Sequence, residues 1–412
     1  MQTSGAREAV QVSAANVRAL DVPLWLKLVF KLIAQIEHGA LSVALPDGRA
    51  FRFAGRVPGK EGILIVRDFR FARRALLGGS LGLAEGYLAG EWESPDVAAL
   101  LELFATNHAA FQSSWRGKFP PGKWLDRVLH AFRRNTRAGA RRNIHAHYDL
   151  GNAFYSRWLD PTMSYSCARF EGREISLCEA QTNKYRALAK RIGLGEGQHV
   201  LEIGCGWGGF ASFAAREAGA RVTGITISKE QYDFARRRVF QEGLADNVEI
   251  LLTDYRDVRG QFDRVASIEM FEAVGERYWP AFFGKVRDSL KPGGLAGLQI
   301  ITIADESFAA YRRGVDFIQR YVFPGGVLPS MNALRDQAAR AGLGWRDNVT
   351  FAEDYARTLG EWRRRFLSEW DDIRALGFDE RFRRLWTYYL SYCEAGFRAR
   401  AIDVTQITLA RA

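Results

Sequence analysis

A glycine-rich turn between an apolar run and a helical pattern constrains the fold of this chain more than any other feature. The apolar run over residues 200–203 leads into Gly204, Gly206 and Gly208, and a helical pattern over residues 210–217 follows. Glycines let a ligand approach the backbone closely at the carboxyl end of a strand, where open α/β sheets bind their ligands. A turn that only reverses the chain also uses glycine, but the order of strand, glycines and helix favours a cofactor site.

Strand-like runs alternate with helical patterns throughout residues 143–412. The runs lie at residues 200–203, 221–226, 248–252, 264–268 and 295–301. Such alternation predicts an α/β domain that is built on a parallel sheet. Two aromatic blocks, residues 355–370 and 378–397, have helical spacing and are expected to form helices over that core.

The first 114 residues mix both kinds of pattern and predict a smaller α+β domain. A helical pattern covers residues 25–36, strand-like runs cover 41–45, 51–53 and 63–66, and helical patterns return at 81–89 and 97–105. The length of 412 residues has room for both domains, at about 150 residues each. With 47% hydrophobic and 25% charged residues, the composition excludes a disordered or fibrous chain.

Between the two domains, residues 115–142 carry most of the positive charge. This segment holds nine Lys or Arg residues and one acid, a net +8 of the +11 of the whole chain. Its apolar residues, which include Trp124 and Phe132, follow helical spacing, and a basic amphipathic helix of this kind binds at an anionic membrane surface. A solvated linker between domains is an equal alternative. Nucleic acid is not expected as a partner, because no nucleic-acid-binding motif is present.

The sequence predicts a cytoplasmic protein that is peripheral on the inner face of the membrane. The apolar stretch over residues 24–36 is interrupted by Lys27 and Lys31, whereas a membrane span needs about 20 apolar residues. No signal peptide is recognised at the N-terminus. The four cysteines form no CxxC pair, which argues against a disulfide framework or a structural zinc site and fits a reducing compartment. No metal site is predicted.

The position of the acidic residues distinguishes between cofactors. A dinucleotide site usually carries an acid about 20 residues after the glycines, but residues 222–228 contain none. Instead, Glu202 precedes Gly204, where it can meet a positively charged ligand. This favours S-adenosylmethionine, which carries an ammonium and a sulfonium group, over NAD. Asp254 and Arg256 follow the predicted strand over residues 248–252 and are expected to close over the adenine. The alternative for Asp254 is that it only caps the end of that strand.

The motifs together resemble the cyclopropane-fatty-acyl-phospholipid synthases, a family that includes mycolic acid cyclopropane synthases. The resemblance covers about residues 143–412. The residues that carry it are 147–152 (HYDLGN), 163–167 (MSYSC), 201–209 (LEIGCGWGG), 224–231 (GITISKEQ), 270–275 (MFEAVG), 321–326 (YVFPGG), 388–393 (YYLSYC) and 396–400 (GFRAR). A looser match at residues 80–92 suggests the smaller lipid-associated domain of the family.

The resemblance implies a Rossmann-like class I methyltransferase domain and a defined reaction. The family transfers the methyl group of S-adenosylmethionine to a cis double bond of an unsaturated phospholipid acyl chain. A bound bicarbonate then acts as the base that removes a proton, which gives a cyclopropane. The resemblance does not tell whether the chain forms a homodimer.

Matched residue by residue, the resemblance also implies the site. The bicarbonate-holding positions are Cys167, Glu272, Tyr355 and, through its backbone, Ile301; Cys393 matches a cysteine near the site. The cofactor contacts are Ser166, Gly204, Gly206, Thr226, Gln231 and Tyr255, to which the glycine motif adds Glu202 and Gly208 and the strand-end motif adds Asp254 and Arg256. Glu272 could instead be a plain helix-start acid, and Tyr355 a core aromatic residue.

Two departures from the family pattern bear on the product. Many members have histidine where this chain has Ala273, and many have a histidine ligand of bicarbonate where Gln299 aligns. Glutamine donates a hydrogen bond to an anion but carries no proton or positive charge. A shifted base could remove a different proton, so a methylated alkene or a methyl branch is a second possible product beside the ring.

Three other functions are weighed against the same residues. The enzyme could methylate a small soluble acceptor, which activity without a lipid surface would indicate. The chain could also be a lipid-binding protein without catalysis, although the intact glycine turn and Glu272 argue against this. A dehydrogenase is the weakest alternative, since only the glycines support it.

Overall fold

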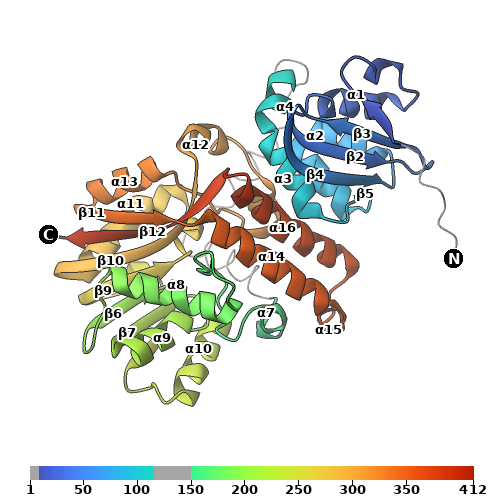
Figure 1. Ribbon diagram of the computed structural model, residues 1–412. Coiled ribbons are helices and arrows are strands. Elements are labelled where there is room, and N and C mark those ends of the chain that lie inside the picture. Colours follow the sequence, from blue (N-terminus) through green and yellow to red (C-terminus); the bar gives the residue numbers. More distant parts are fainter. Residues whose placement is uncertain (1–8, 116–149) are drawn as a thin grey trace. The chain divides into compact units, whose positions relative to one another are not determined.

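The computed structural model describes residues 9–115 and 150–412, and the chain divides into two compact units (Figure 1). One unit consists of Met1–Asp126 and Phe378–Ala401, and the other of Arg127–Gly377 and Ile402–Ala412. The basic segment over residues 116–142 lies outside the described residues, so its predicted amphipathic helix stays a prediction.

The first unit is an α+β domain around a five-stranded sheet. The strand order is β1-β3-β2-β4-β5, with β1 at Val10–Val12, β2 at His38–Ala44, β3 at Ala50–Ala54, β4 at Val57–Val66 and β5 at Trp92–Glu93. Its helices are η1 (Val17–Ala19), α1 (Leu24–Ile33), α2 (Arg70–Leu88), α3 (Val97–Thr106), α4 (His108–Trp115) and α16 (Glu380–Arg398). The ring of Phe30 on α1 packs edge-on against Phe51 and Phe53 of β3, which anchors α1 to the sheet.

The division differs from the predicted boundary in one element, because α16 belongs to the first unit although it lies near the C-terminus. Helix α16 packs against α3 and α2. On α16, Tyr388 is fully buried and lies 5.6 Å from the ring of Tyr87, and Arg384 forms an ion pair with Glu93 at 2.9 Å. These contacts join segments that are about 300 residues apart, which sequence patterns do not show.

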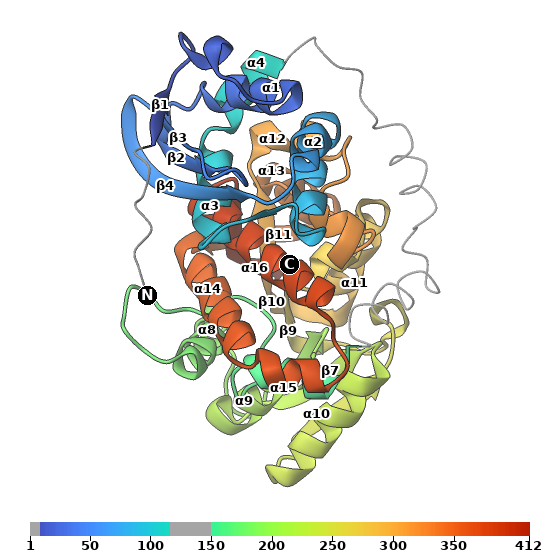
Figure 2. The same ribbon diagram turned by 90° about the vertical axis from the view of Figure 1, so that its right-hand side faces the viewer.

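The second unit is a Rossmann-like α/β domain around a seven-stranded sheet (Figures 1 and 2). The strand order is β11-β12-β10-β9-β6-β7-β8, with β6 at His199–Ile203, β7 at Arg221–Thr226, β8 at Val248–Leu252, β9 at Phe262–Ile268, β10 at Leu290–Ile303, β11 at Leu343–Thr350 and β12 at Ile402–Arg411. Strand β12 runs antiparallel to both of its neighbours, and the other paired strands are parallel.

Helices pack on both faces of this sheet. The helices of this unit are α7 (Asn152–Trp158), α8 (Leu177–Arg191), α9 (Gly209–Ala218), α10 (Lys229–Gln241), α11 (Trp279–Ser289), α12 (Asp305–Tyr311), α13 (Met331–Arg340), α14 (Ala352–Ser368) and α15 (Trp370–Ala375), with short turns η2 (Tyr255–Asp257), η3 (Phe271–Ala273), η4 (Glu276–Tyr278) and η5 (Ile318–Val322). Helices α8, α9 and α10 pack on one face and α11 and α13 on the other.

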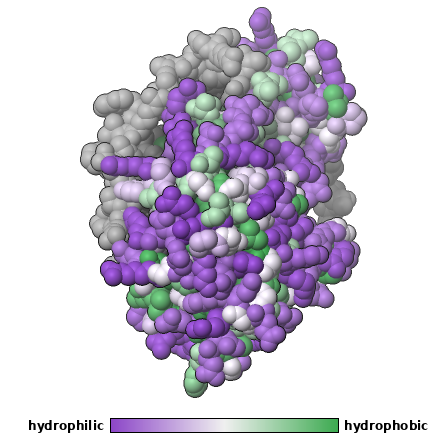
Figure 3. Space-filling view, turned by 90° about the vertical axis from the view of Figure 1, so that its left-hand side faces the viewer, coloured by the Kyte–Doolittle hydropathy of each residue, from purple (hydrophilic) through white to green (hydrophobic). Residues whose placement is uncertain are grey.

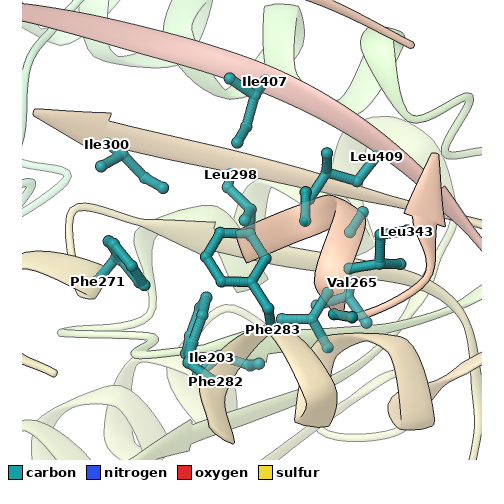
Figure 4. Packing of buried hydrophobic residues seen from close by; sticks show 14 of the residues in the cluster. Ile203, Val265, Phe271, Phe282, Phe283, Leu298, Ile300, Leu343, Ile407 and Leu409 are labelled. Atoms are coloured by element: carbon teal, nitrogen blue, oxygen red, sulfur yellow. The ribbon is translucent and has the colours of Figure 1, made fainter. Parts of the chain in front are cut away.

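The core follows from alternation along the strands. Val200 of β6 faces the cluster under α8 and α9, whereas Leu201 faces the cluster under α11. Figure 4 shows Phe282 and Phe283 reaching from α11 toward the strands, where Leu298 lies on β10. The five predicted strands of this domain are confirmed, and both aromatic blocks form helices as predicted. The helix of the second block, α16, belongs to the first unit and not to this α/β core, contrary to the prediction.

Two features of the outside of the protein bear on the predicted location. On the face drawn in Figure 3, hydrophobic residues are scattered among hydrophilic ones. Within residues 9–115 and 150–412, no helix combines the length and the hydrophobicity that a membrane crossing requires.

Candidate active site

The predicted glycine turn follows β6 and needs glycine for two reasons. Gly204, Gly206 and Gly208 have φ angles of +83°, +52° and +82°, in the left-handed region that L side chains rarely adopt. At Gly204, an added Cβ would lie 2.7 Å from Cγ of Met270, which is closer than real Cβ atoms approach. Met270 therefore packs directly on the glycine turn, and it joins this turn to the segment after β9.

Glu202 lies on β6 just before this turn, and one of its carboxylate oxygens has no partner. The residue is 2% exposed, and its buried Oε2 makes no hydrogen bond. Burial raises the pKa of Glu202 to about 8, although the nearby charge of Lys184 lowers it. A buried carboxylate with an unsatisfied oxygen fits a cationic ligand at this turn. The site therefore fits the ammonium-bearing cofactor that the resemblance implies.

Most of the other predicted cofactor residues lie just after β7 and β8. Thr226 donates to Oε1 of Gln231 at 3.0 Å, which fixes this side chain at the start of α10. Asp254 accepts from the backbone N–H of Arg256 at 3.0 Å and binds its guanidinium at 2.6 Å. Asp254 thus caps the turn η2, as the alternative interpretation expects. Burial raises the pKa of Tyr255 to about 12, so this phenol is neutral.

Three of the predicted catalytic positions converge on a residue that the sequence analysis did not select, Glu269. Its Oε1 accepts the backbone N–H of Cys167 at 2.8 Å and Nε2 of Gln299 at 2.7 Å. Its Oε2 accepts the hydroxyl of Tyr355 at 2.5 Å. Burial raises the pKa of Glu269, while these three donors oppose that effect. We call these four residues the Glu269 network.

A pair of glutamines in the sheet fixes the orientation of this network. Gln299 on β10 and Gln406 on β12 are direct partners in the strand register, and both side chains are fully buried. Nε2 of Gln406 donates to Oε1 of Gln299 at 3.0 Å. Because that oxygen is engaged, the amide nitrogen of Gln299 faces Glu269. Gln406 therefore helps to position the network.

Glu272 and Ile301 form a second pair close to the network. The backbone N–H of Ile301 donates to Oε1 of Glu272 at 2.6 Å, and the buried Oε2 makes no hydrogen bond. Burial and then the charge of Glu269 raise the pKa of Glu272 to about 8. Glu269 has several hydrogen-bond donors and Glu272 has few, and two carboxylates in such different surroundings take different protonation states.

Ser166 connects to the network through a buried lysine. Lys184 on α8 is fully buried and donates to Oγ of Ser166 and to Oε1 of Gln181, each at 2.6 Å. Burial lowers the pKa of Lys184 to about 8, while the carboxylate of Glu269 raises it. Lys184 therefore supplies positive charge near both Glu202 and Glu269, whose charges act on it.

The two predicted cysteines lie in different units. The thiol of Cys167 is fully buried and donates to the carbonyl of Ala168 at 3.1 Å. Burial raises the pKa of Cys167 well above its usual range, so the thiol stays protonated. Cys393 lies on α16 of the first unit, and its predicted role near the site stays a prediction.

The sequence contains a signal for Glu269, Lys184 and Gln181, the site residues that it did not lead us to select. Glu269 is the first residue after β9, at the sheet edge where ligands bind, and only three positions before Glu272. Lys184 and Gln181 share the helical face of Leu177 and Leu188, so both polar side chains are predicted to be buried. A buried polar residue is the informative exception in such a pattern.

Comparison with known proteins identifies the family. The family model for mycolic acid cyclopropane synthetase matches residues 135–407. The chain is 40% identical over 387 residues to the tuberculostearic acid methyltransferase UfaA1 of Mycobacterium tuberculosis, covering 91% of this chain and 88% of the relative. It is 37% identical over 391 residues to the cyclopropane-fatty-acyl-phospholipid synthase of Escherichia coli, covering 90% of this chain and 95% of the relative.

A solved structure agrees with this assignment. The mycolic acid cyclopropane synthase CmaA1, complexed with SAH and CTAB, has a TM-score of 0.62 and 31% identity, covering 66% of this chain and 98% of that one. The chain therefore belongs to the mycolic acid cyclopropane synthetase family, and it is an S-adenosylmethionine-dependent methyltransferase that modifies acyl chains.

Proposed function

We propose that this enzyme transfers the methyl group of S-adenosylmethionine to a cis double bond of an unsaturated phospholipid acyl chain. The product is a cyclopropane or a methylated chain. One observation carries the proposal: Met270, which lies between Glu269 and Glu272, packs directly on Gly204. The half-buried side chains of Glu269 and Glu272 thus lie next to the turn that fits the cofactor.

The chemistry needs both parts of this arrangement. S-adenosylmethionine supplies an electrophilic methyl group, and an alkene is a weak nucleophile that must be held close to it. Glu202 is placed to attract the positive charge of the cofactor. After methyl transfer the acyl chain carries a cation, and a carboxylate in the site can stabilise that charge and accept a proton.

A phospholipid substrate is favoured by the name of one relative and by the surface of the first unit. The relative from Escherichia coli is called a cyclopropane-fatty-acyl-phospholipid synthase. At the start of α1, Leu24 and Trp25 are 69% and 36% exposed, and Lys31 is exposed on the same helix. An amphipathic element with exposed apolar and basic residues suits an anionic lipid surface. The basic segment over residues 115–142 adds to this attraction, which would place the enzyme on the inner face of the membrane.

The bicarbonate that the resemblance implies does not enter this proposal. Its matched donors are already engaged, since the N–H of Cys167 and the hydroxyl of Tyr355 bind Glu269, and the N–H of Ile301 binds Glu272. An added anion would meet two carboxylates in place of donors. The residues present do not fit bicarbonate.

A lipid assay tests the proposed function. Purified enzyme is incubated with methyl-labelled S-adenosylmethionine and liposomes of cis-monounsaturated, partly anionic phospholipid, and the acyl chains are analysed by mass and double-bond position. We expect label in the acyl chains, and none with a fully saturated phospholipid as the matched control. Label in a soluble fatty acid or other small acceptor, with none in liposomes, would instead support the soluble-acceptor function. Binding of the liposomes without any transfer would support the lipid-binding alternative.

A further inference from the structure

We propose that the carboxylate of Glu269 occupies the place that the resemblance assigns to bicarbonate and is itself the base of the reaction. The enzyme would then carry its base in its own chain and work without bicarbonate. The inference rests on the proposed function, because it names the group that accepts the proton in that reaction.

The contacts of Glu269 are those expected of a held anion. One carboxylate accepts three hydrogen bonds, from the backbone of Cys167, the amide of Gln299 and the hydroxyl of Tyr355. Two of these donors, Cys167 and Tyr355, are positions that the resemblance gives to bicarbonate. The third, Gln299, is the position where many members have a histidine ligand. Where many members have a histidine that binds bicarbonate, this chain therefore has Gln299, which donates to the carboxylate of Glu269 instead.

The backbone at Glu269 indicates a specific demand on this position. Its φ angle is +49°, in the left-handed region that is strained for a residue with a Cβ. Its N–H is held by the carbonyl of Gln299 on β10 at 2.8 Å. The surrounding structure therefore holds Glu269 in a strained conformation directly after β9, and this conformation places its carboxylate among three donors.

Glu269, rather than Glu272, is the carboxylate that is available as the base, because it is the one that stays ionised. Ionised carboxylates need donors, and Glu269 has three whereas Glu272 has one. The two charges repel each other, so one proton is retained by the pair, and it resides on the carboxyl with fewer donors. The buried ammonium of Lys184 further favours the charge on Glu269. Glu269 is thus the carboxylate that is free to accept a proton.

The step balances with the groups present. Methyl transfer breaks the sulfonium–methyl bond and uses the alkene π electrons to form one carbon–carbon bond, which leaves a cation on the neighbouring carbon. Glu269 takes a proton from the transferred methyl, and the C–H electron pair closes the cyclopropane ring. If Glu269 takes a proton from an adjacent chain carbon instead, the electron pair of that C–H bond forms an alkene. The proton on Glu269 then passes to solvent.

The experiment compares the wild type with Glu269→Gln and Glu269→Gly in carbonate-free buffer, with and without added bicarbonate. We expect the wild-type rate to change less than about twofold with bicarbonate. Glu269→Gln should lower the rate by about 10²–10⁴-fold, the usual contribution of a positioned base, while the dissociation constant of S-adenosylmethionine changes less than about threefold. Glu249→Gln, the same change at an exposed position on β8, is the matched control and should be active.

Glu269→Gly tests whether the carboxylate of Glu269 occupies the bicarbonate position as well as whether it acts as the base. It removes the carboxylate, frees the three donors and relieves the backbone strain, so added bicarbonate should restore activity by at least about tenfold. Binding of ¹³C-bicarbonate, followed by NMR line broadening, should be seen with Glu269→Gly and not with the wild type. This second measurement does not depend on finding the lipid substrate.

Two results would overturn the inference while leaving the proposed function intact. One is a wild type that labels lipid only when bicarbonate is present. The other is a Glu269→Gln variant that binds the cofactor and keeps most of its activity. A wild type that binds cofactor but labels no phospholipid would contradict the proposed function instead, and the NMR comparison would still decide whether the wild-type site excludes bicarbonate.

Discussion

Strands β6 and β9 are neighbours in the sheet and end in carboxylates that are arranged in opposite ways. Glu202 on β6 is buried with one oxygen that makes no hydrogen bond. Glu269 after β9 is surrounded by three donors from β10, α14 and the loop before α8. A buried charge must be compensated, so the first carboxylate needs a partner from a ligand, whereas the protein itself supplies the partners of the second.

The comparison shows how one sheet edge can serve two purposes. An unsatisfied carboxylate gains most when a cation arrives, so it contributes to binding. A carboxylate held by fixed donors needs no reorganisation when charge develops nearby, so it contributes to the chemical step. Changes at the end of β6 should therefore alter cofactor affinity, and changes around Glu269 should alter the rate.

The largest effect on cofactor affinity is expected from Gly204→Ala. The new Cβ would meet the side chain of Met270 at 2.7 Å, and alanine would be strained at a φ of +83°. A cost of about 3 kcal/mol in the bound conformation of the turn corresponds to an affinity for S-adenosylmethionine that is lower by about 100-fold. Isothermal titration calorimetry measures it. Gly195→Ala is the control, since its φ is ordinary and no atom lies near the added Cβ. Equal affinities for the two variants would contradict the assigned role of the turn.

A smaller effect, on rate alone, is expected from Tyr355→Phe. The change removes the hydroxyl that donates to Oε2 of Glu269, and a hydrogen bond to a charged group contributes about 2 kcal/mol. We expect the turnover number to fall by about 30-fold and the affinity for S-adenosylmethionine to stay within about threefold. Because the anion loses a donor, the pKa of Glu269 should rise, and the acidic limb of the pH–rate profile should move to higher pH.

Tyr232→Phe is the control for this change. Tyr232 is half-buried on α10, where its ring lies beside Arg236 rather than near Glu269. Its loss should leave both the turnover number and the pH profile as they are. A Tyr355→Phe variant with weakened cofactor binding and an unchanged pH profile would show that Tyr355 is a core aromatic residue, the alternative that the sequence left open.

The two carboxylate sites also differ in how far the sequence predicts them. The end of β6 is predictable because Glu202 and the three glycines lie within seven residues of one another and their conformation is a local property. The Glu269 network is not, since Tyr355 lies 86 residues after Glu269 and the φ of +49° depends on the surrounding fold. The strand β12 was missed for a similar reason: Thr405, Gln406 and Thr408 break its apolar pattern, and their burial is evident only from the neighbouring strands.

An effect of about tenfold per pH unit is expected on cofactor binding. Burial raises the pKa of Glu202 to about 8, so the free carboxyl is largely protonated at pH 6 to 7. A cationic ligand binds the ionised form, and its affinity should therefore rise with pH up to about 8 and become constant above it. Calorimetry of S-adenosylmethionine between pH 6 and 9 measures this slope. Glu202→Gln should bind more weakly and show no slope, and a wild-type affinity that falls with rising pH would refute the assignment.

The smallest effect is expected from Cys167→Ala, although Cys167 is a predicted catalytic position. Its contribution to the Glu269 network is the backbone N–H, which alanine retains. Burial raises the pKa of the thiol well above its usual range, so it is neither a nucleophile nor a base at neutral pH. We expect the rate of lipid labelling to change less than about threefold, with an unchanged pH profile. A loss of more than tenfold would mean that the sulfur itself takes part in the reaction. Glu269 would then not be the only reactive group after β9, and the contrast with the cofactor-binding end of β6 would have to include Cys167.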